Sequence, residues 1–463
     1  MFQNVLIANR GAVAARVLRT VQAMGMRATV VYAEVDRELP YVALADHALA
    51  LPGDDPRACY LNQDALLAAL ERSGADALHP GYGFLAENAE FARRVQAAGV
   101  TFIGPAPARI EAMGHKTRAR QWMAEHGLPM SPSSPLLGDD PTAIIAAAQA
   151  LGYPVLVKPA GGGGGIGMLP AHDDASLLKA VAQARQAAAR SFSCTDVYLE
   201  RLLLQPRHIE FQVLADRQGQ VRVLFERDCS LQRRHQKILE EAPAPALPRP
   251  ALDAMADAVQ AALQRGGYDN IGTVETLHAG GSFEFLEMNT RLQVEHAVTE
   301  AVTGLDLVEA QIRLAAGESL NDVLPATPRL QGHAIEARLY AEDPLRFLPS
   351  PGVLQQLRWP AGEGIRIETG YAEGNRVTPY FDPMIGKIIA HGPDRASAIA
   401  RLRQALTQTV VVGVKTNLPF LVQALDDADF QAGRVHTGLT QQVVAALRAA
   451  PQPIPTITEE HTP

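Results

Sequence analysis

The sequence has few cysteines and no excess of positive charge. Only three cysteines occur in 463 residues. Cys59, Cys194 and Cys229 lie far apart and show no C-x-x-C spacing, so they predict neither a disulfide framework nor a zinc site, as is typical of a reducing compartment. The formal net charge of −8 argues against a protein that covers nucleic acid or an anionic membrane surface.

The sequence also lacks an apolar segment long enough to cross a membrane. Its longest apolar stretch, AIIAAAQALGYPVLV, is interrupted by Gln149, Gly152 and Pro154, whereas a membrane-spanning helix needs about 20 apolar residues. The first residues carry no basic segment before their short apolar run, so they do not resemble a secretory signal. We therefore expect a cytoplasmic chain without a membrane or nucleic-acid partner.

What is present is the composition of a globular protein with several domains. The chain is 47% hydrophobic and 20% charged, and its length predicts two to four domains. Residues 4–110 alternate short apolar strands with helical patterns, which predicts a parallel sheet with crossover helices. The turn NRGAVA after the first strand has Gly11 alone instead of G-x-G-x-x-G, which disfavours a dinucleotide-binding unit.

Beyond residue 115 the pattern becomes a mixture of helices and strands. Residues 115–150 look mainly helical and lead into a strand that ends at Lys158, after which come a glycine-rich loop, a helix and another strand. The proline-rich, polar end of the chain predicts a disordered tail. The expected fold class is α/β, with α+β character in the later part.

The loop PAGGGGGIGM, residues 159–168, predicts a phosphate-binding segment. Glycines allow backbone N–H groups to close around phosphate oxygens, and Lys158 stands just before them. The loop is not a P-loop, because no G-K-[ST] follows. A flexible surface turn would explain the glycines alone, but with a strand-borne cation they favour a nucleotide triphosphate.

The segment VETLHAGGSFEFLEMN predicts a β-hairpin with two carboxylates on one face. With the turn centred on the first of its two glycines, Glu275 and Glu287 lie one diagonal step apart on adjacent strands, and Asn289 follows on the same face. Two close carboxylates on a buried face repel unless a cation joins them, and Mg²⁺ bound to substrate phosphates prefers such oxygen ligands. Phe283 and Phe285, expected on that face, disfavour a solvated acidic strand.

The same alternation continues through EFLEMNTRLQVEH. Arg291, Gln293 and Glu295 occupy every second position after Asn289, so a single extended strand would carry all of them on one face. A cation, an amide and a base form a suitable set to hold and deprotonate a small oxyanion. A surface ladder of salt bridges is the competing explanation.

Three other features remain open on the residues alone. In RDCSLQRRHQKILEEAPAP a solvated basic loop explains Arg233, whereas His235 and Lys237 are functional only if they reach the triphosphate. The turn HPGYGFLAEN places Tyr82 between a strand and a helix, and turn chemistry explains it equally well. Arg338 lies on an alternating strand, where a structural role is the ordinary explanation.

Together these segments resemble the biotin carboxylase family of the ATP-grasp superfamily. The resemblance is carried, in family order, by IANRG, HPGYGFLAEN, MGHK, the glycine loop, RDCSLQRRHQK, EMNTRLQVEH and RLYAEDP. It implies an amino-terminal parallel-sheet, or pre-ATP-grasp, domain at 1–114 and an ATP-grasp lid with connecting helices at 115–203. The ATP-grasp base with the carboxy-terminal domain would occupy 204–447, and the tail 448–463.

The resemblance also implies roles for individual residues. The positions that would contact ATP are Lys116, Lys158, Gly164, Gly165, Glu200, Arg201, Leu202, Leu203, His208, Gln232, His235, Glu275 and Glu287. Mg²⁺ or Mn²⁺, at two sites, would be held by Glu275, Glu287 and Asn289. Bicarbonate would be held by Lys237, Arg291, Gln293, Val294 and Glu295, and biotin by Tyr82 and Arg338. The implied catalytic residues are Arg291, Glu295, Lys237 and Arg338.

The implied activity is the ATP- and bicarbonate-dependent carboxylation of carrier-bound biotin at N1 through carboxyphosphate. Glu295 would deprotonate bicarbonate, and Arg338 would stabilise the biotin enolate. The sequence has no A-M-K-M-type biotinylation site. The expected partners are therefore a separate biotin carboxyl carrier protein and carboxyltransferase subunits, as in acetyl-CoA carboxylase or a related acyl-CoA or urea-type carboxylase.

Several positions depart from the commoner pattern of the family. Ala12 replaces a usual Glu, Ala86 a Ser and His115 an Asp, and Ile166 stands where Arg or Lys is frequent. Ala23 replaces an acidic residue on the helix that often forms the dimer interface, so a homodimer is an expectation separate from catalysis. None of these departures removes a group with an implied catalytic role.

Two other classes of function share some of these features. Another ATP-grasp ligase, which joins a carboxylate to an amine through an acyl phosphate, would use the same lid and metal site, but not Arg291, Gln293 and Arg338 together. A catalytically silent scaffold would hold a biotin carrier without turning over ATP, and the intact set of charged residues disfavours it.

Overall fold

The computed structural model describes residues 1–161, 167–192 and 195–449. The predicted positions Gly164, Gly165 and Ile166, together with Cys194 and nearly all of the predicted tail, lie outside the described residues. Within the described residues, no helix is long and apolar enough to cross a membrane.

The amino-terminal region is a five-stranded parallel sheet in the order β3-β2-β1-β4-β5. β1 is buried at all four residues, as expected for a parallel strand with helices on both faces. This sheet confirms the prediction for residues 4–110. The elements are β1 (Asn4–Ile7), α1 (Gly11–Ala23), β2 (Arg27–Tyr32), η1 (Glu34–Asp36), α2 (Pro40–Leu44), β3 (His47–Ala50), α3 (Gln63–Ser73), β4 (Ala77–His79), α4 (Ala89–Ala97), β5 (Thr101–Phe102) and α5 (Pro107–Met113).

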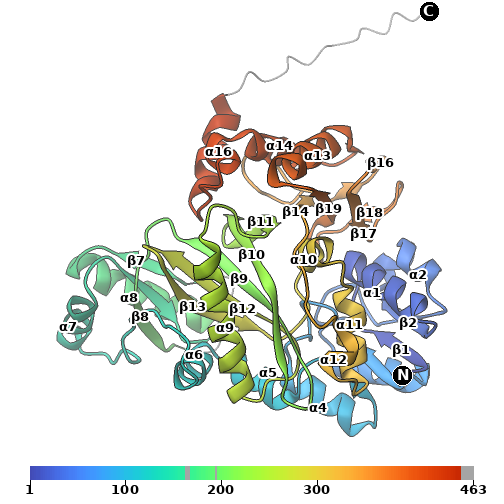
Figure 1. Cartoon of the computed structure of the whole chain (residues 1–463), viewed down its shortest axis with the longest axis horizontal. Coiled ribbons are helices and arrows are strands. Elements are labelled where there is room, and N and C mark those ends of the chain that lie inside the picture. Colours follow the sequence, from blue (N-terminus) through green and yellow to red (C-terminus); the bar gives the residue numbers. More distant parts are fainter. Residues whose placement is uncertain (162–166, 193–194, 450–463) are drawn as a thin grey trace, which may run out of the picture.

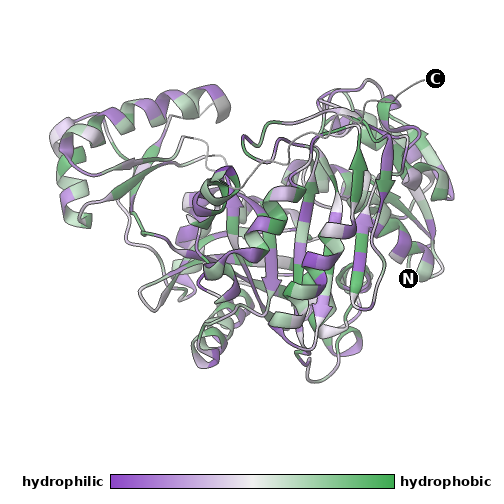
Figure 2. Ribbon diagram, turned by 90° about the horizontal axis from the view of Figure 1, so that it is seen from above, coloured by the Kyte–Doolittle hydropathy of each residue, from purple (hydrophilic) through white to green (hydrophobic). Residues whose placement is uncertain are grey.

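The next region extends from the body of the molecule as an arm (Figure 1). Its three-stranded antiparallel sheet has the order β7-β6-β8, and apolar side chains of this sheet pack against α7 and α8. Figure 2 shows these helices striped with hydrophilic and hydrophobic segments, as expected when one face of a helix is buried. The elements are α6 (Lys116–Glu125), α7 (Pro141–Leu151), β6 (Val155–Pro159), β7 (Leu169–Ala171), α8 (Asp174–Phe192) and β8 (Val197–Arg201).

The centre of the molecule is an eight-stranded sheet in the order β13-β12-β9-β10-β11-β14-β19-β17, in which neighbouring strands pair antiparallel. It continues without a break from the part beside the arm into the carboxy-terminal region (Figure 1). The elements of its first part are β9 (Arg207–Ala215), β10 (Val221–Arg233), β11 (Gln236–Ala242), α9 (Arg249–Arg265), β12 (Asn270–Ala279), β13 (Ser282–Asn289), α10 (His296–Thr303), α11 (Leu307–Ala315) and α12 (Leu320–Val323).

The carboxy-terminal region adds the remaining strands of this sheet and two small two-stranded sheets, β15-β18 and β16-β20. Helices α13, α14 and α16 cover it with an apolar cluster that includes Leu402, Phe420 and Leu439. The elements are β14 (His333–Tyr340), β15 (Gly352–Val353), β16 (Gln356–Arg358), β17 (Ile365–Thr369), β18 (Arg376–Val377), β19 (Met384–Gly392), α13 (Arg395–Gln408), β20 (Val410–Val412), α14 (Leu418–Asp426), α15 (Ala428–Gln431) and α16 (Leu439–Ala449).

The β12–β13 hairpin differs from its prediction in turn and register. Ala279 pairs with Ser282, so both glycines form a two-residue turn and both have positive φ, as the mirror-image hairpin turns require. An irregularity between Glu275 and Thr276 then shifts the register, and Glu275 lies directly opposite Glu287. The predicted diagonal offset was wrong because no residue pattern marks this bulge.

Two further expectations about this segment were wrong. Phe283 and Phe285 pack in the apolar cluster with Val274 and Phe211, whereas Glu287 faces a cavity; the bulge separates the faces that simple alternation had merged. The strand also ends at Asn289. The residues beyond it, up to the start of α10, form a loop rather than a continued strand.

Gly370 provides a test of how the amino-terminal and carboxy-terminal regions meet. A Cβ atom at this position would overlap the backbone of Gly11 and Ala12. We expect Gly370→Ala to lower the free energy of unfolding by about 1–3 kcal/mol, because neither backbone can yield without a shift. Gly138→Ala, where nothing lies within 4 Å, should change it by less than about 0.5 kcal/mol. Equal unfolding free energies of the two variants in urea would contradict this packing.

Candidate functional site

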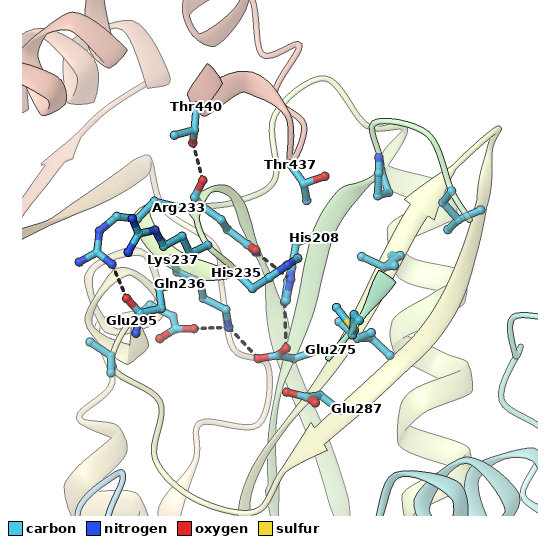
Figure 3. A pocket seen from close by; sticks show the side chains of 18 of the residues that line it. His208, Arg233, His235, Gln236, Lys237, Glu275, Glu287, Glu295, Thr437 and Thr440 are labelled. Atoms are coloured by element: carbon cyan, nitrogen blue, oxygen red, sulfur yellow. Dashed lines mark hydrogen bonds and ion pairs between the residues drawn. The ribbon is translucent and has the colours of Figure 1, made fainter. Parts of the chain in front are cut away.

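A cavity of about 920 Å³ opens between the arm and the eight-stranded sheet (Figure 3). Most of the residues implied for ATP, metal and bicarbonate line it: Lys116, Lys158, Glu200, Arg201, Leu203, His208, Gln232, His235, Lys237, Glu275, Glu287, Asn289, Arg291, Gln293, Val294, Glu295 and Arg338. Two predicted residues are not among the described residues that line this cavity: Leu202, and Tyr82, which lines a second cavity. The structure thus gathers residues that are up to 222 positions apart in the sequence, Lys116 to Arg338.

The arm contributes a buried ion-pair cluster to the cavity wall. Lys158 Nζ donates to Glu200 Oε2 at 2.7 Å across β6 and β8. Arg120 on α6, which the sequence analysis did not identify, lies 2.8 Å from the other carboxylate oxygen. Burial raises the pKa of Glu200, but the charges of Lys158 and Arg120 outweigh it and lower the pKa. Two fixed cations therefore hold an ionised carboxylate at the wall of the cavity.

The opposite wall carries the two paired carboxylates of the hairpin. Glu275 and Glu287 face each other across β12 and β13, and Asn289 Nδ2 donates to Glu275 Oε1 at 2.9 Å. The Glu287 side chain is 34% exposed, and its nearest cation, Lys116 Nζ, is 3.7 Å away. Glu287 therefore keeps accessible oxygens. Two carboxylates and an amide oxygen on one wall fit the hard-oxygen preference of Mg²⁺.

A neighbouring trio, His208, Glu210 and Glu275, also has ligand atoms within 4.8 Å of one another, but its chemistry does not suit a metal. Lys237 Nζ already binds both carboxylates, so an ammonium group stands where a metal ion would. Burial lowers the pKa of His208, but the charge of Glu275 raises it to about 9. A protonated imidazole has no lone pair to offer a metal.

Lys237 on β11 is the centre of the charge network at the base of the cavity. Its Nζ lies 2.5 Å from Glu210, 2.7 Å from Glu275 and 2.5 Å from Glu295. Figure 3 shows Lys237 between Glu275 and Glu295. Burial lowers the pKa of Lys237, but these three carboxylates outweigh it and raise the pKa well above its usual value. Glu210 was missed in the sequence, although it stands two positions after His208 on β9, and side chains two apart on a strand share one face.

Glu295 is fully buried at the N-terminus of α10 and lies between two cations. Its second oxygen accepts from Arg338 NH2 at 2.9 Å, and Arg338 Nε donates to Glu240 on β11. Burial raises the pKa of Glu295, but the charges of Lys237 and Arg338 lower it overall. The side chain is therefore a carboxylate, the form that can accept a proton.

Arg291, on the loop after β13, is held by three of its neighbours. Its Nε donates to Glu87 at 2.8 Å, and its two terminal nitrogens donate to Gln293 and Asn289, each at 3.0 Å. Gln293 Nε2 in turn lies 3.3 Å from Glu275 Oε1. The residues that we expected on one strand face thus converge through a loop, and Glu87 of the HPGYGFLAEN turn fixes the guanidinium from the amino-terminal region.

The basic segment around Arg233 is a strand pair and not a solvated loop. β10 and β11 are joined by Arg234 and His235, both with positive φ. Arg233 is only 7% exposed, forms an ion pair with Glu342 and lies over the ring of Tyr340. The interpretation of Arg233 as a solvated side chain was therefore wrong. The turn instead directs His235 and Lys237 into the cavity.

A second cavity of about 360 Å³ adjoins the first and is lined by Tyr82, Gly83 and Phe381. Val294 and Arg338 line both cavities. The guanidinium of Arg338, which is bound to Glu295, therefore stands where the two cavities meet.

A cavity between a small antiparallel sheet and a larger sheet, with cations on one wall and paired carboxylates on the other, is typical of an ATP-grasp ligase. Three family models match the chain: "Biotin carboxylase, N-terminal domain" at 1–110, "Carbamoyl-phosphate synthase L chain, ATP binding domain" at 115–323 and "Biotin carboxylase C-terminal domain" at 336–442. The chain belongs to the biotin carboxylase family. It is an ATP-dependent ligase with biotin carboxylase activity, the first half-reaction of biotin-dependent carboxylases.

The similar proteins cover nearly the whole chain. Biotin carboxylase of Halalkalibacterium halodurans is 46% identical over 94% of this chain and 97% of the relative. Biotin carboxylase of Pseudomonas aeruginosa is 45% identical over 94% of this chain and 97% of the relative. Both support the biotin carboxylase interpretation over a carboxylate–amine ligase or a silent scaffold.

Solved structures agree with this assignment. The biotin carboxylase domain dimer of Hydrogenobacter thermophilus 2-oxoglutarate carboxylase, in complex with MgADP, ADP and bicarbonate, has a TM-score of 0.93 at 40% identity and covers 97% of this chain and 100% of that one. Biotin carboxylase of Campylobacter jejuni in a β-γ-ATP complex has a TM-score of 0.92 at 39% identity, covering 96% and 99%. The predicted fold class and family are therefore confirmed, whereas the proposed domain boundaries stay a prediction.

The charge network makes a prediction about Lys237. In Lys237→Met three buried carboxylates lose their common cation, and we expect a loss of about 3–5 kcal/mol in unfolding free energy at pH 7. In the wild-type chain the pKa values of Glu210 and Glu275 are lowered because Lys237 outweighs their burial. Their stabilisation is thus present above the unfolded pKa, near 4.5, and is lost as the pH falls.

In the variant Arg227, His208 and Arg338 remain beside these carboxylates, but without Lys237 burial raises their pKa values above those of the wild type, so they take up protons at a higher pH. The stability deficit should shrink as the pH is lowered from 8 to 5 in urea titrations. Lys415→Met, at a lysine that is 70% exposed and paired with Asp343, should stay within about 0.5 kcal/mol of wild type at every pH. A deficit for Lys237→Met that is independent of pH would show that the network does not hold these charges.

Proposed function

We propose that this chain carboxylates the N1 atom of biotin on a carrier protein, using bicarbonate and ATP, through carboxyphosphate. The observation that carries the proposal is the position of Glu295, a buried carboxylate bound to Lys237 on one side and to Arg338 on the other. Arg338 and Val294 border both cavities. A base placed there can serve an anion in the larger cavity while Arg338 reaches a second substrate in the smaller one.

ATP would occupy the larger cavity, with its phosphates between the arm and the hairpin. The supporting features are the cations Lys116 and Lys158 on the arm side and the protonated His208 on the sheet side. His235 also lines the sheet side, where burial lowers its pKa and its ring can serve as a neutral contact. Fixed cations around a triphosphate stabilise the charge that moves during phosphoryl transfer. The remaining nucleotide contacts that we propose are Gly164, Gly165, Glu200, Arg201, Leu202, Leu203 and Gln232.

Glu275, Glu287 and Asn289 would hold Mg²⁺ or Mn²⁺, at two sites. Asn289 Oδ1 already accepts from Arg291, and a carbonyl oxygen has a second lone pair. When bound, a divalent cation neutralises phosphate charge as the phosphoryl group is transferred. In the Hydrogenobacter structure the named ligands include MgADP and bicarbonate, which supports the same combination here.

Bicarbonate would lie beside Lys237, Arg291, Gln293, Val294 and Glu295. Glu295 removes its proton, and the resulting oxyanion attacks the γ-phosphorus as the bond to ADP breaks. Lys237 and Arg291 stabilise the charge that develops. The carboxyphosphate formed then breaks at its carbon–oxygen bond to give carbon dioxide and phosphate.

Biotin would occupy the smaller cavity, with Tyr82 beside its ring and Arg338 at its ureido oxygen. Within the described part of the chain, the guanidinium of Arg338 donates to Glu240 and Glu295, which aim it at the junction of the two cavities. The phosphate released from carboxyphosphate accepts the N1 proton as biotin becomes the enolate. A cation at the ureido oxygen stabilises this enolate, and N1 then forms a bond to carbon dioxide.

The partners that we propose are a biotin carboxyl carrier protein and carboxyltransferase subunits, with a homodimer of this chain as one assembly. One relative is named as a component of a pyruvate carboxylase, and one similar structure is a dimer. The relatives are named for pyruvate, 2-oxoglutarate and methylcrotonoyl-CoA. The family therefore leaves the final acceptor to the carboxyltransferase, and acetyl-CoA is one candidate.

The activity is tested by ADP release with purified chain, ATP and Mg²⁺. We expect release to require bicarbonate and to rise on addition of free biotin, because capture of carbon dioxide removes a product. The control omits bicarbonate from degassed buffer. Release that ignores both bicarbonate and biotin but rises with an amine would overturn the proposal in favour of a carboxylate–amine ligase.

The role of Glu295 makes a sharper prediction. Glu295→Gln keeps the size of the side chain but cannot accept a proton, so kcat for bicarbonate-dependent ADP release should fall by about 10²–10⁴-fold. The Kd for ATP should change less than about threefold. Glu240→Gln, a buried neighbour that also contacts Arg338, should lose less than about tenfold in kcat. Parallel losses of turnover and ATP affinity in Glu295→Gln would contradict its assignment as the base.

A further inference from the structure

Two consecutive peptide carbonyls in the loop before α10 are held from behind by buried side chains. His296 Nδ1 lies 2.7 Å from the carbonyl oxygen of Gln293, so this nitrogen must be the donor. Lys387 Nζ on β19 donates to the carbonyl oxygen of Val294. His296 and Lys387 are both 0% exposed. Neither is among the described residues that line the two cavities.

Lys387 is itself fixed by two other buried groups. Its Nζ lies 3.2 Å from Glu336 on β14 and 3.0 Å from Glu368 on β17. With the Val294 carbonyl these make three acceptors, the full donor capacity of an ammonium group. Burial lowers the pKa of Lys387, but the charges of Glu336 and Glu368 outweigh it and raise the pKa. The lysine therefore stays charged and has no donor left for a ligand.

Further ion pairs connect this point to the amino-terminal region. Glu368 lies 3.3 Å from Arg16 on α1, and Arg16 also binds Glu300 on α10 at 2.8 Å. Arg366 on β17 binds the other oxygen of Glu300 at 2.7 Å. The support of the loop thus includes α1, α10, β14, β17 and β19, and a backbone with so many fixed partners has little freedom to rotate its peptide planes.

We propose that His296 and Lys387 are positioning residues that fix the backbone from Gln293 to Glu295 for bicarbonate. The inference rests on the proposed function, because it concerns how the bicarbonate-binding residues are oriented. The two hydrogen bonds fix both peptide planes, and these planes set the directions in which Gln293, Val294 and Glu295 face the cavity. A loop could not otherwise hold three groups at the precision that catalysis requires.

His296 suits this role because it stays neutral. Burial lowers its pKa well below the usual range, and the positive charge of Lys387 lowers it further. Its Nε2 has no hydrogen-bond partner among the described residues, so the ring contributes one hydrogen bond, the one to Gln293. Asparagine can place an amide N–H where the Nδ1–H of histidine stands, whereas leucine fills the space without a donor.

The experiment compares variants that keep or remove these two donors, using bicarbonate-dependent ADP release. Lys387→Met and His296→Leu should lower kcat/KM for bicarbonate by about 10–100-fold, the range for displaced positioning groups, while KM for ATP changes less than about threefold. His296→Asn should recover most of the loss. Glu336→Gln removes a buried charge, but its amide oxygen can still accept from Lys387, so the hydrogen bond to Val294 is kept. This variant should lower Tm but leave kcat/KM for bicarbonate, relative to kcat/KM for ATP, within about twofold of wild type.

Amide hydrogen exchange gives a readout that does not depend on activity. Peptides covering residues 290–300 should exchange faster in His296→Leu and Lys387→Met than in wild type, His296→Asn or Glu336→Gln. If Lys387→Met fails to fold, the His296 pair decides the matter alone. Equal effects on ATP and bicarbonate, or no difference between His296→Leu and His296→Asn, would overturn the inference. Wild-type chain without bicarbonate-dependent ADP release would instead overturn the proposed function.

Discussion

Three buried carboxylates, those of Glu210, Glu275 and Glu295, converge on the ammonium group of Lys237. A carboxylate without a partner cannot remain ionised in such an environment at an acceptable cost. Lys237 therefore makes it possible for a metal-ligand candidate and a base to lie in the same buried cluster. It also keeps both in the ionised form that their proposed roles need.

The fold places this cluster where three parts of the chain meet. The eight-stranded sheet carries Lys237 and Glu275, the loop before α10 carries Glu295, and the carboxy-terminal part of the same sheet carries Arg338. One sheet runs from β13, beside the arm, to β17 in the carboxy-terminal region. The spacing of its strands therefore sets the distance from Glu275 and Glu287 to the second cavity. The proposed reacting groups on the sheet and its adjoining loop are therefore held at fixed positions relative to one another.

The sequence predicted which residues meet, but it predicted their geometry less well. Alternation along β13 correctly grouped Glu287 with Asn289, whereas the bulge at Glu275 and the end of the strand at Asn289 left no mark in the pattern. Simple alternation of side chains therefore predicted the wrong face of the strand for Phe283 and Phe285. Arg233 looked like a surface cation because composition cannot reveal a partner as distant in the sequence as Glu342.

The residues that were missed share one cause. Arg120 and Glu210 act through partners on other elements, and such pairings exist only once the chain has folded. Local patterns indicate strands, turns and glycine loops, because these depend on neighbours in the sequence. The assignment of a catalytic group needs the long-range packing that brings β11, α10 and β14 together.

In the reaction that we propose, an oxygen of bicarbonate bonds to the γ-phosphorus of ATP while Glu295 holds its proton. The most direct test uses bicarbonate labelled with ¹⁸O in all three oxygens, with ATP and biotin, and mass spectrometry of the phosphate released. We expect one labelled oxygen in each phosphate, since the oxygen that attacks phosphorus stays there when carboxyphosphate breaks at its carbon–oxygen bond. Phosphate without label, produced at the full rate of ADP release, would contradict it.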